Sequence, residues 1–288
     1  MKIGISGVSG LVGSHLRQML KREQNANILS IPRKLLFGKP ENLADFIQNC
    51  EIIIHLSGAP IICRWNKKNK KILRDSRILS TENLSAAIGL LKIKPNLFIS
   101  TSAVGIYDTE NIHEESSVNF ANDFLGKLCQ DWEKAALETE THGVRTVIFR
   151  LGVVLSDKGG ALAKALPLFK LALGGKLGNG NQPFPFVHIN DLQKAYLHAI
   201  TNENSHGVYN LVAPDLITNA NYTKELSACL NRPAFFHVPA FVLKLIFGEG
   251  AIVLLSGQKV MPERLIDEGF VFDSQNIKST IYSLLRSS

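Results

Sequence analysis

The chain has 288 residues, of which 45% are hydrophobic and 20% charged, and a formal net charge of +7 at pH 7. This is the composition of a globular protein with one large domain, or a domain and a smaller lobe. Basic residues are spread out apart from a cluster at 67–71 that no nucleic-acid-binding module accompanies, so we expect no nucleic-acid partner.

The first predicted element is a short apolar strand at 1–6, which leads into the glycine turn 7–13 and an amphipathic helix. Strand, glycine turn and helix in this order are typical of dinucleotide-binding folds, where a pyrophosphate meets free N–H groups at the helix start. The alternative is an ordinary glycine-rich βα turn. The residues expected to contact the cofactor here are Gly7, Ser9, Gly10, Leu11 and Val12.

A second strand is expected at 27–32, ending in Pro32 and followed by Arg33 and Lys34. NAD-specific folds carry an acid at this tip that accepts the ribose 2′-OH, whereas an arginine can bind a 2′-phosphate. No acid occurs before Glu41, so the sequence favours NADP(H) over NAD(H). An exposed basic loop is the alternative.

Only residues 35–37 could form the next strand, so we expect at most a vestigial edge strand there, followed by a helix at 41–50. A buried strand at 51–56 ends in small residues that suit close approach of a cofactor. The expected cleft residues are Leu56, Ser57 and Gly58. His55 is interpreted as a core histidine in preference to a catalytic one.

A long helix is expected at 66–91, with Arg77 either reaching the cofactor cleft or pairing on the surface. The next strand begins at 96–99 and runs into a series of hydroxyl groups. Hydroxyls at a strand end followed by a tyrosine suit contact with a reacting carbonyl or alcohol, or the capping of turns. Ser102 and Tyr107 are the candidate catalytic residues, and Ser100 is a candidate cofactor contact.

A helix at 119–142 and a strand at 144–150 continue the alternation. Alternating strands and helices predict an α/β, Rossmann-like, doubly wound parallel sheet. Arg150, at the end of this strand, is either an ion-pair residue or a cofactor-side group.

The later elements suggest a smaller lobe. Pro167 is expected to kink a helix at 161–173, and the glycine-rich loop 174–182 is expected to be flexible and is a candidate substrate lid. Asn190 or Asp191 should cap the next helix. Further elements are expected at 208–212 (strand), 219–230 (helix) and 235–238 (strand). We expect a cofactor domain at 1–155, a substrate lobe sharing the same core at 156–238, and a small helical domain at 239–288.

A cytoplasmic protein without membrane contact is expected. The apolar tract 241–255 is too short and too charged to span a bilayer, and the N-terminus enters a glycine turn too soon for a signal peptide. The cysteines are far apart, which fits a reducing compartment and predicts neither a metal site nor a disulfide framework. They are Cys50, Cys63, Cys129 and Cys229.

As a set, motifs along nearly the whole chain resemble the YfcH-like, sugar-nucleotide-epimerase-like group of atypical extended short-chain dehydrogenases/reductases. The motifs are Gly7-Val8-Ser9-Gly10-Leu11-Val12-Gly13, His55-Leu56-Ser57-Gly58-Ala59-Pro60, Ser76-Arg77, Ser102-Ala103-Val104-Gly105-Ile106-Tyr107, Asp131-Trp132-Glu133, Arg150-Leu151-Gly152-Val153-Val154-Leu155, Gly174-Gly175-Lys176-Leu177-Gly178, His188-Ile189-Asn190-Asp191, Asn210-Leu211-Val212-Ala213-Pro214 and Gly257-Gln258-Lys259-Val260-Met261-Pro262.

The resemblance implies an NADP-type cofactor and a small-molecule substrate, with nucleotide sugars among the candidates. By position it also implies the roles of particular residues: Pro32 and Arg33 at the adenosine phosphate, Leu56 and Ser57 lining the cleft, and Arg77 and Val153 touching the cofactor.

The chain departs from active extended reductases at the YxxxK pair, whose positions hold Leu125 and Cys129. Neither residue can act as the acid/base or lower its pKa. Ser102 and Tyr107 could substitute, although Asp108 replaces the glycine that follows the family's tyrosine. An NADP-dependent oxidoreductase or epimerase and a catalytically degenerate NADP(H)-binding sensor or partner-binding protein therefore both stay open, as do a monomer and a homodimer.

Overall fold

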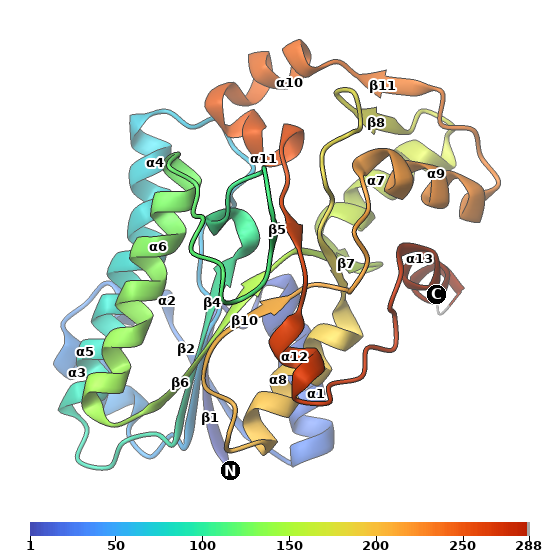
Figure 1. Ribbon diagram of the computed structural model, residues 1–288. Helices are drawn as coiled ribbons and strands as arrows, with labels where there is room; N and C mark the ends of the chain where they lie inside the picture. Colours follow the sequence, from blue (N-terminus) through green and yellow to red (C-terminus); the bar gives the residue numbers. More distant parts are fainter. Residues whose placement is uncertain (287–288) are drawn as a thin grey trace.

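The computed structural model describes residues 1–286 and contains a six-stranded parallel sheet with helices on both faces (Figure 1). The strand order is β10-β6-β4-β3-β1-β2. The strands are β1 (Lys2–Ser6), β2 (Asn27–Ile31), β3 (Ile52–His55), β4 (Leu97–Ala103), β6 (Arg145–Leu151) and β10 (Gly207–Leu211). The predicted α/β, Rossmann-like, doubly wound fold is confirmed.

The strands are apolar on both faces because helices cover both faces. In β3, Ile52 and Ile54 belong to one core and Ile53 to the other. The first core packs on α1 (Leu11–Gln24) and α8 (Ile189–Thr201). The second packs on α3 (Pro40–Ile47), α5 (Ser80–Leu90) and α6 (Phe124–Leu137). Side chains that alternate along a strand therefore supply two separate cores.

β2, the strand that follows β1 in the chain, pairs with one side of β1, and β3 pairs with the other side, so the winding direction reverses at β1. In open parallel sheets, ligands bind at such a switch point, beyond the carboxyl ends of the strands. Ser6, at the end of β1, pairs with both Ile31 and His55. The residues just after these three strand ends therefore share one edge of the sheet.

Several predicted elements take a different form. Residues 33–36 form a short helix, α2 (Arg33–Leu36), instead of an edge strand. The helix expected at 66–91 consists of α4 (Lys67–Arg74), a π-helical turn η1 (Asp75–Leu79) and α5. The helix expected at 119–142 begins only at Phe124, because Asp123 caps it, and ends in the 3₁₀ turn η3 (Glu138–His142).

The cap of α8 is His188, whose ring Nδ1 accepts from the Asn190 N–H at 2.9 Å, so the expected cap at Asn190 or Asp191 was wrong. Asp191 is buried and accepts instead from the backbone N–H groups of Asp273 and Ser274. A tertiary bond to the C-terminal segment therefore determines the position of this carboxylate.

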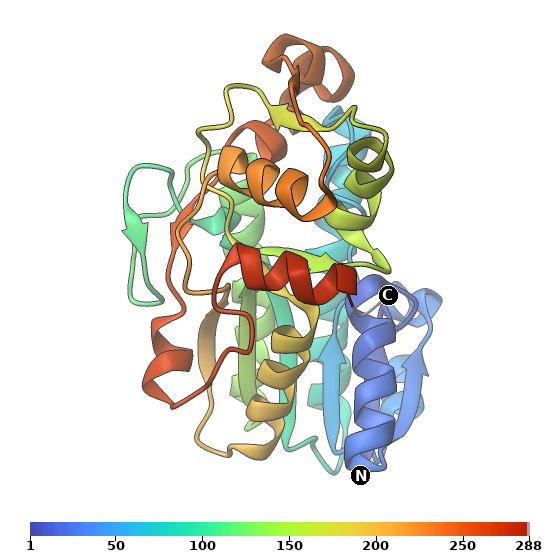
Figure 2. The ribbon, with the colours of Figure 1, turned by 90° about the vertical axis from the view of Figure 1, so that its right-hand side faces the viewer.

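A second group of elements lies beyond the carboxyl ends of the sheet strands (Figures 1 and 2). It comprises β7 (Val153–Ser156), α7 (Gly160–Lys170), β8 (Gly175–Leu177), β9 (Phe186–His188), α9 (Asn219–Leu230), β11 (Phe236–Val238), α10 (Ala240–Phe247), η4 (Gly248–Ala251) and α11 (Ile252–Leu255). β8 pairs with β11, and β7 pairs with β9. The glycine-rich segment is thus partly a paired strand, where a flexible loop was expected.

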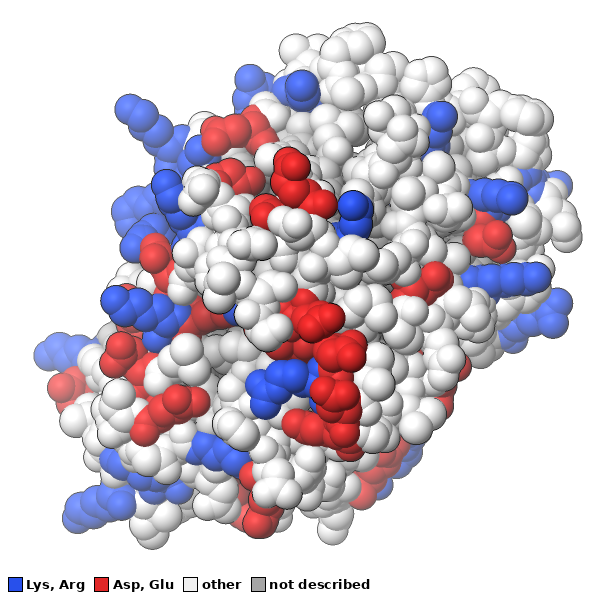
Figure 3. All heavy atoms as spheres, viewed as in Figure 1, with Lys and Arg blue, Asp and Glu red and all other residues white. Residues whose placement is uncertain are grey.

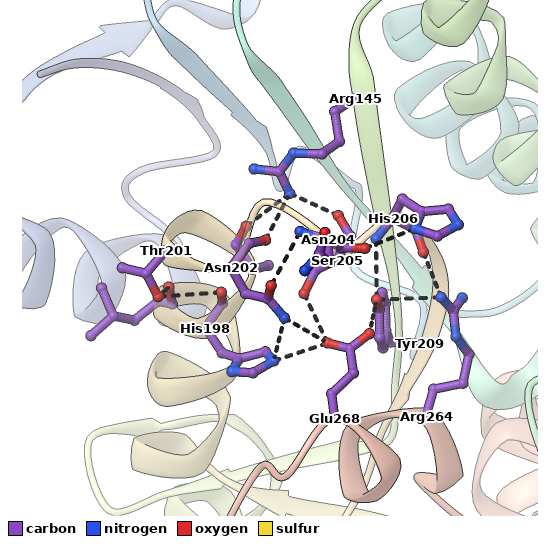
Figure 4. A network of polar contacts seen from close by, with 12 residues as sticks. Arg145, His198, Thr201, Asn202, Asn204, Ser205, His206, Tyr209, Arg264 and Glu268 are labelled. Carbon is purple, nitrogen blue, oxygen red and sulfur yellow. Dashed lines mark hydrogen bonds and ion pairs between the residues drawn. The ribbon is translucent and has the colours of Figure 1, made fainter.

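The remaining elements are η2 (Val104–Ile106), β5 (Ile112–His113), β12 (Lys259–Val260), α12 (Glu263–Asp267) and α13 (Ile277–Arg286). Glu268, just after α12, joins this segment to the sheet: it accepts from Tyr209 at 2.5 Å, Ser205 at 2.8 Å and His198 at 2.9 Å (Figure 4). Within residues 1–286, no helix is both long and apolar enough to cross a membrane.

Candidate functional site

The glycine turn brings three backbone segments into contact. A Cβ on Gly7, whose φ is +71°, would lie 2.9 Å from the carbonyl carbon and oxygen of Leu56. A Cβ on Gly13 would lie 2.3 Å from the Gly7 oxygen. Only glycine fits at either position, because both neighbours are backbone. The turn is therefore packed against the end of β3 and the start of α1 simultaneously.

The start of α1 presents backbone donors to this edge. Gly10 caps the helix without a side chain, and Ser14 N is the first N–H to bond back along the helix, to Gly10 O at 2.9 Å. The N–H groups of Leu11 and Val12 precede that bond and are oriented for an anion. A cavity of about 360 Å³ lies here, lined by Ser9, Gly10, Leu11, Ser14, His15, Gln18, Lys158, Gly159 and Gly160.

Below the turn, His55 holds the ends of β1 and β3 together. Its Nδ1 lies 2.7 Å from Ser6 Oγ, and its Nε2 lies 3.2 Å from Ser80 Oγ. The side chain is fully buried, and burial lowers its pKa to about 4. A neutral, hydrogen-bonded imidazole at pH 7 confirms the interpretation of His55 as a core histidine.

The loop after β3 is fixed by the π-helical turn. Ser76 Oγ accepts from Ala59 N at 3.0 Å, and Arg77 Nη2 donates to Ala59 O at 3.0 Å. A Cβ on Gly58 would lie 3.3 Å from the Arg77 guanidinium, which also lies over the Trp132 ring at 5.3 Å. Arg77 thus lies beside the predicted cleft residue Gly58 and makes no surface ion pair within residues 1–286.

Two other predicted contacts follow the ends of two further strands, β2 and β6. Pro32 caps α2, and Arg33 is exposed at its start, two residues beyond the Ile31–Ser6 pair. Val153 begins β7, and its N–H donates to Pro185 O at 2.8 Å. Arg33 and Val153 thus follow β2 and β6, on either side of the glycine turn.

Ser102, Glu133, Arg150 and Tyr107 form a buried polar network at the ends of β4 and β6. Arg150 donates to the Glu133 carboxylate through Nε at 2.8 Å and Nη2 at 2.7 Å. Ser102 Oγ donates to the same carboxylate at 2.6 Å, and Arg150 Nη1 donates to the Tyr107 hydroxyl at 2.6 Å. Of the two alternatives for Arg150, the structure shows the ion pair. Its assignment to the cofactor stays a prediction.

The two candidate catalytic residues are members of this network. Ser102 is 2% exposed and Tyr107 is 0% exposed. The Tyr107 hydroxyl has two acceptors in reach, Asn210 Oδ1 at 2.9 Å and Glu114 O at 3.0 Å. Burial raises the pKa of Tyr107, with Arg150 opposing the shift, so the phenol is protonated at neutral pH. Their catalytic roles stay predictions.

Glu133 belongs to the Asp131-Trp132-Glu133 motif, but it was not among the predicted site residues. Its one available signal is helical spacing, since Cys129, Trp132 and Ala136 flank it on the buried face of α6. Ser100 is also fully buried, and within the described part of the chain its hydroxyl has no hydrogen-bond partner. Its predicted contact with a cofactor stays a prediction.

The positions of the usual tyrosine and lysine are structural. A Cβ on Gly105 would lie 2.6 Å from Leu125 Cδ2, so Leu125 packs directly against η2. Cys129 is buried, and burial raises its pKa to about 12. A neutral thiol of this kind cannot act as a base at pH 7. No group at these two positions can carry the proton.

Comparison with known proteins identifies the family. Residues 3–211 match the NAD dependent epimerase/dehydratase family, and residues 238–284 match a domain of unknown function, DUF1731. A chloroplastic epimerase family protein SDR39U1 homologue of Arabidopsis thaliana is 32% identical over 99% of this chain and 87% of its own length.

Two solved structures are similar over the whole chain. Human epimerase family protein SDR39U1, crystallised with NADPH, has a TM-score of 0.92 at 31% identity and covers 100% of both chains. A nucleoside-diphosphate sugar epimerase from Corynebacterium glutamicum has a TM-score of 0.79 at 29% identity and covers 99% of this chain and 58% of that one. The chain therefore belongs to the NAD dependent epimerase/dehydratase family, which confirms the predicted resemblance.

Proposed function

We propose that this member of the NAD dependent epimerase/dehydratase family binds NADP(H) at the carboxyl ends of β1, β2 and β3. One observation carries the proposal: the backbone of Gly7 lies against Leu56, directly beside the free N–H groups that begin α1. A side chain at Gly7 would collide with the Leu56 backbone, so the glycine allows the end of β3 to pack next to the helix start, where a diphosphate would bind. The NADPH in the crystal structure of the human relative supports the choice of ligand.

The chain's own residues would divide the cofactor between them. Backbone donors of residues 9–12 would hold the diphosphate, and Arg33 the 2′-phosphate. Leu56, Ser57 and Gly58 would line the edge next to Arg77, and Val153 would face it from β7. We assign residues 1–155 to the cofactor and 156–238 together with 239–288 to the substrate side.

The experiment is a calorimetric titration of the purified protein with NADPH and, separately, with NADH. We expect Arg33→Ala to weaken NADPH binding by about tenfold or more, since a charge-assisted contact with the phosphate is lost, and to leave NADH unchanged. Lys39→Ala, a nearby exposed cation, is the matched control. Equal affinity of wild type and Arg33→Ala for NADPH would contradict the proposed contact between Arg33 and the 2′-phosphate.

For activity, we propose an oxidoreductase or epimerase acting on a small carbonyl compound, with nucleotide sugars among the candidates. The nicotinamide would supply the hydride. Ser102 would polarise the substrate oxygen and Tyr107 would hold the proton, both positioned through Glu133 and Arg150. The chemistry would come from the cofactor and the positioning from the fold.

A catalytically degenerate NADP(H)-binding sensor or partner-binding protein is the second candidate, favoured by the burial of Ser102 and Tyr107 and by Leu125 and Cys129 at the YxxxK positions. NADPH oxidation with a panel of carbonyl compounds separates the two candidates. Turnover of any compound above the rate without protein supports the enzyme. Tight NADPH binding without turnover on any compound supports the sensor.

A further inference from the structure

A second cavity, of about 570 Å³, lies between the glycine-rich segment and helices α10 and α11. Its volume is within the range of about 300–1,000 Å³ found for small-molecule sites. The elements around it lie above the sheet in Figures 1 and 2. The lining residues are Gly178, Asn179, Gln182, His237, Pro239, Ala240, Lys244 and Leu255.

Hydrogen bonds fix the walls of this cavity. β8 pairs with β11, and Gly178 N donates to Val238 O at 2.9 Å just beyond that pairing. Gln182 Nε2 donates to Leu177 O at 3.1 Å and to Leu254 O at 2.9 Å, which joins the glycine-rich segment to α11. The cavity is therefore part of the folded architecture and not a gap between loose loops.

The polar side of the cavity favours an anion. Lys244 and His237 line it, and within the described residues that line it none is acidic. Lys244 makes no salt bridge with any residue in 1–286. An unpaired ammonium group beside amide side chains is suited to a carboxylate or a phosphate.

The other side of the cavity is apolar. Leu255, Pro239 and Ala240 form this wall. Two large apolar side chains of α10, next in the chain to Ala240 and Lys244, are exposed. Phe241 is 72% exposed and Leu245 73% exposed. Figure 3 shows that the upper right of this face is mostly white, with scattered Lys and Arg side chains. Clustered exposed apolar groups of this kind mark binding sites.

The cavity connects to the proposed cofactor edge through a short piece of chain. Gln182 lines the cavity, and Pro185, three residues later, accepts from Val153 N at 2.8 Å. Three residues span at most about 11 Å. One wall of the cavity therefore lies within about 11 Å of the residue that bonds to Val153, a predicted cofactor contact.

We propose that this cavity binds a small amphiphilic anion, a carboxylate or phosphate attached to an apolar body, as the substrate of the NADP(H)-dependent reaction. The substrate role rests on the proposed function, whereas the binding itself does not. Lys244 holds the anionic group, and the wall around Leu255 holds the apolar body. A nucleotide sugar, which is polar along its whole length, fits this wall poorly.

The test uses octanoate as the probe, with octan-1-ol as its uncharged counterpart and UDP-glucose as the nucleotide sugar, each titrated calorimetrically into the full-length protein. We expect one saturable octanoate site per chain and weaker binding of octanol. Lys244→Gln should weaken octanoate binding by about tenfold or more. The matched control is Lys278→Gln, an exposed lysine on α13, which should leave the affinity unchanged.

Absence of saturable octanoate binding overturns the proposal, as does equal affinity in wild type and Lys244→Gln, or UDP-glucose binding that is lost in Lys244→Gln. An NADPH titration of the same sample separates the two failures. NADPH binding without octanoate binding overturns the inference alone. Octanoate binding that depends on Lys244, without NADPH binding, supports the ligand class and overturns the substrate role together with the proposed function.

Discussion

At the glycine turn, the backbone of Gly7 lies against the backbone of Leu56, and Gly13 packs against Gly7, so no side chain is needed for the geometry. At the ends of β4 and β6, the side chains of Ser102, Glu133, Arg150 and Tyr107 hold one another. The first region has no room for an added Cβ at Gly7 or Gly13. The second contains a buried charge pair, so we expect the removal of either partner to destabilise it.

This difference shows that two regions at the same edge of one sheet tolerate opposite kinds of change. The glycine turn has no room for a side chain at Gly7 or Gly13, so it is sensitive to the smallest added group. A buried ion pair requires its partner, because an uncompensated charge in the interior is strongly unfavourable. Variants of the two regions should therefore separate ligand binding from stability.

The largest effect is expected for Glu133→Ala. It leaves the Arg150 guanidinium buried without its carboxylate, which should lower the free energy of unfolding by about 3–5 kcal/mol in chemical denaturation. The matched control on the same helix is Asp131→Ala, whose 3.3 Å pair with Arg74 is half exposed, and its loss should stay below about 1 kcal/mol. Similar losses in both variants would mean that burial does not distinguish the pairs.

The next effect is a pH dependence from His55, whose pKa is lowered from 6.5 to about 4 by burial. The unfolded chain takes up a proton near pH 6.5 and the folded chain only near pH 4, so the stabilisation is complete above pH 6.5 and is lost as the pH falls toward 4. The loss should reach about 3 kcal/mol.

Denaturation curves at pH 7, 5.5 and 4.5 measure this effect. His55→Gln should flatten the dependence, while His206→Gln, at an exposed histidine, should keep it. An unchanged slope in His55→Gln would show that other groups carry the acid sensitivity. His55 joins the ends of β1 and β3 next to the glycine turn, so this variant tests stability at that edge without changing a predicted cofactor contact.

The smallest effect on stability is expected for Gly13→Ala, whose Cβ would lie 2.3 Å from Gly7 O. The added methyl group would push Gly7 away from the helix start. This displacement should lower the free energy of unfolding by about 1–3 kcal/mol and weaken NADPH binding by about tenfold or more. Gly38→Ala is the control, because its Cβ would meet its nearest atom at 3.4 Å. Unchanged NADPH affinity in Gly13→Ala would show that the glycine turn does not bind the diphosphate.

The glycine turn was predictable from sequence because its residues are close together in the chain. Gly7, Gly10 and Gly13 stand between an apolar strand and an amphipathic helix, and the alternation of strands and helices defined the sheet. The position of Arg33 just after β2 was predictable for the same reason, while its phosphate contact stays a prediction. Local order in the chain becomes local order in space at the carboxyl ends of parallel strands.

The buried network was not predictable in this way. Glu133 and Arg150 come from a helix and a strand, and only packing shows that their side chains meet at 2.7 Å. Spacing likewise assigned the cap of α8 to Asn190 or Asp191, although a tertiary bond draws Asp191 toward Ser274 and leaves His188 as the cap. The burial of Tyr107 depends in the same way on distant residues such as Asn210.

The π-helical turn at Asp75–Leu79 also limits which insertions and deletions the chain can accept. Ser76 on this turn anchors the loop at Ala59, and Ser80 just after it anchors His55. Deleting one residue between them would rotate one anchor relative to the other by about 100°. The number of residues between Ser76 and Ser80 therefore cannot change. A chain shortened here would keep only one of the two hydrogen bonds, to Ala59 or to His55.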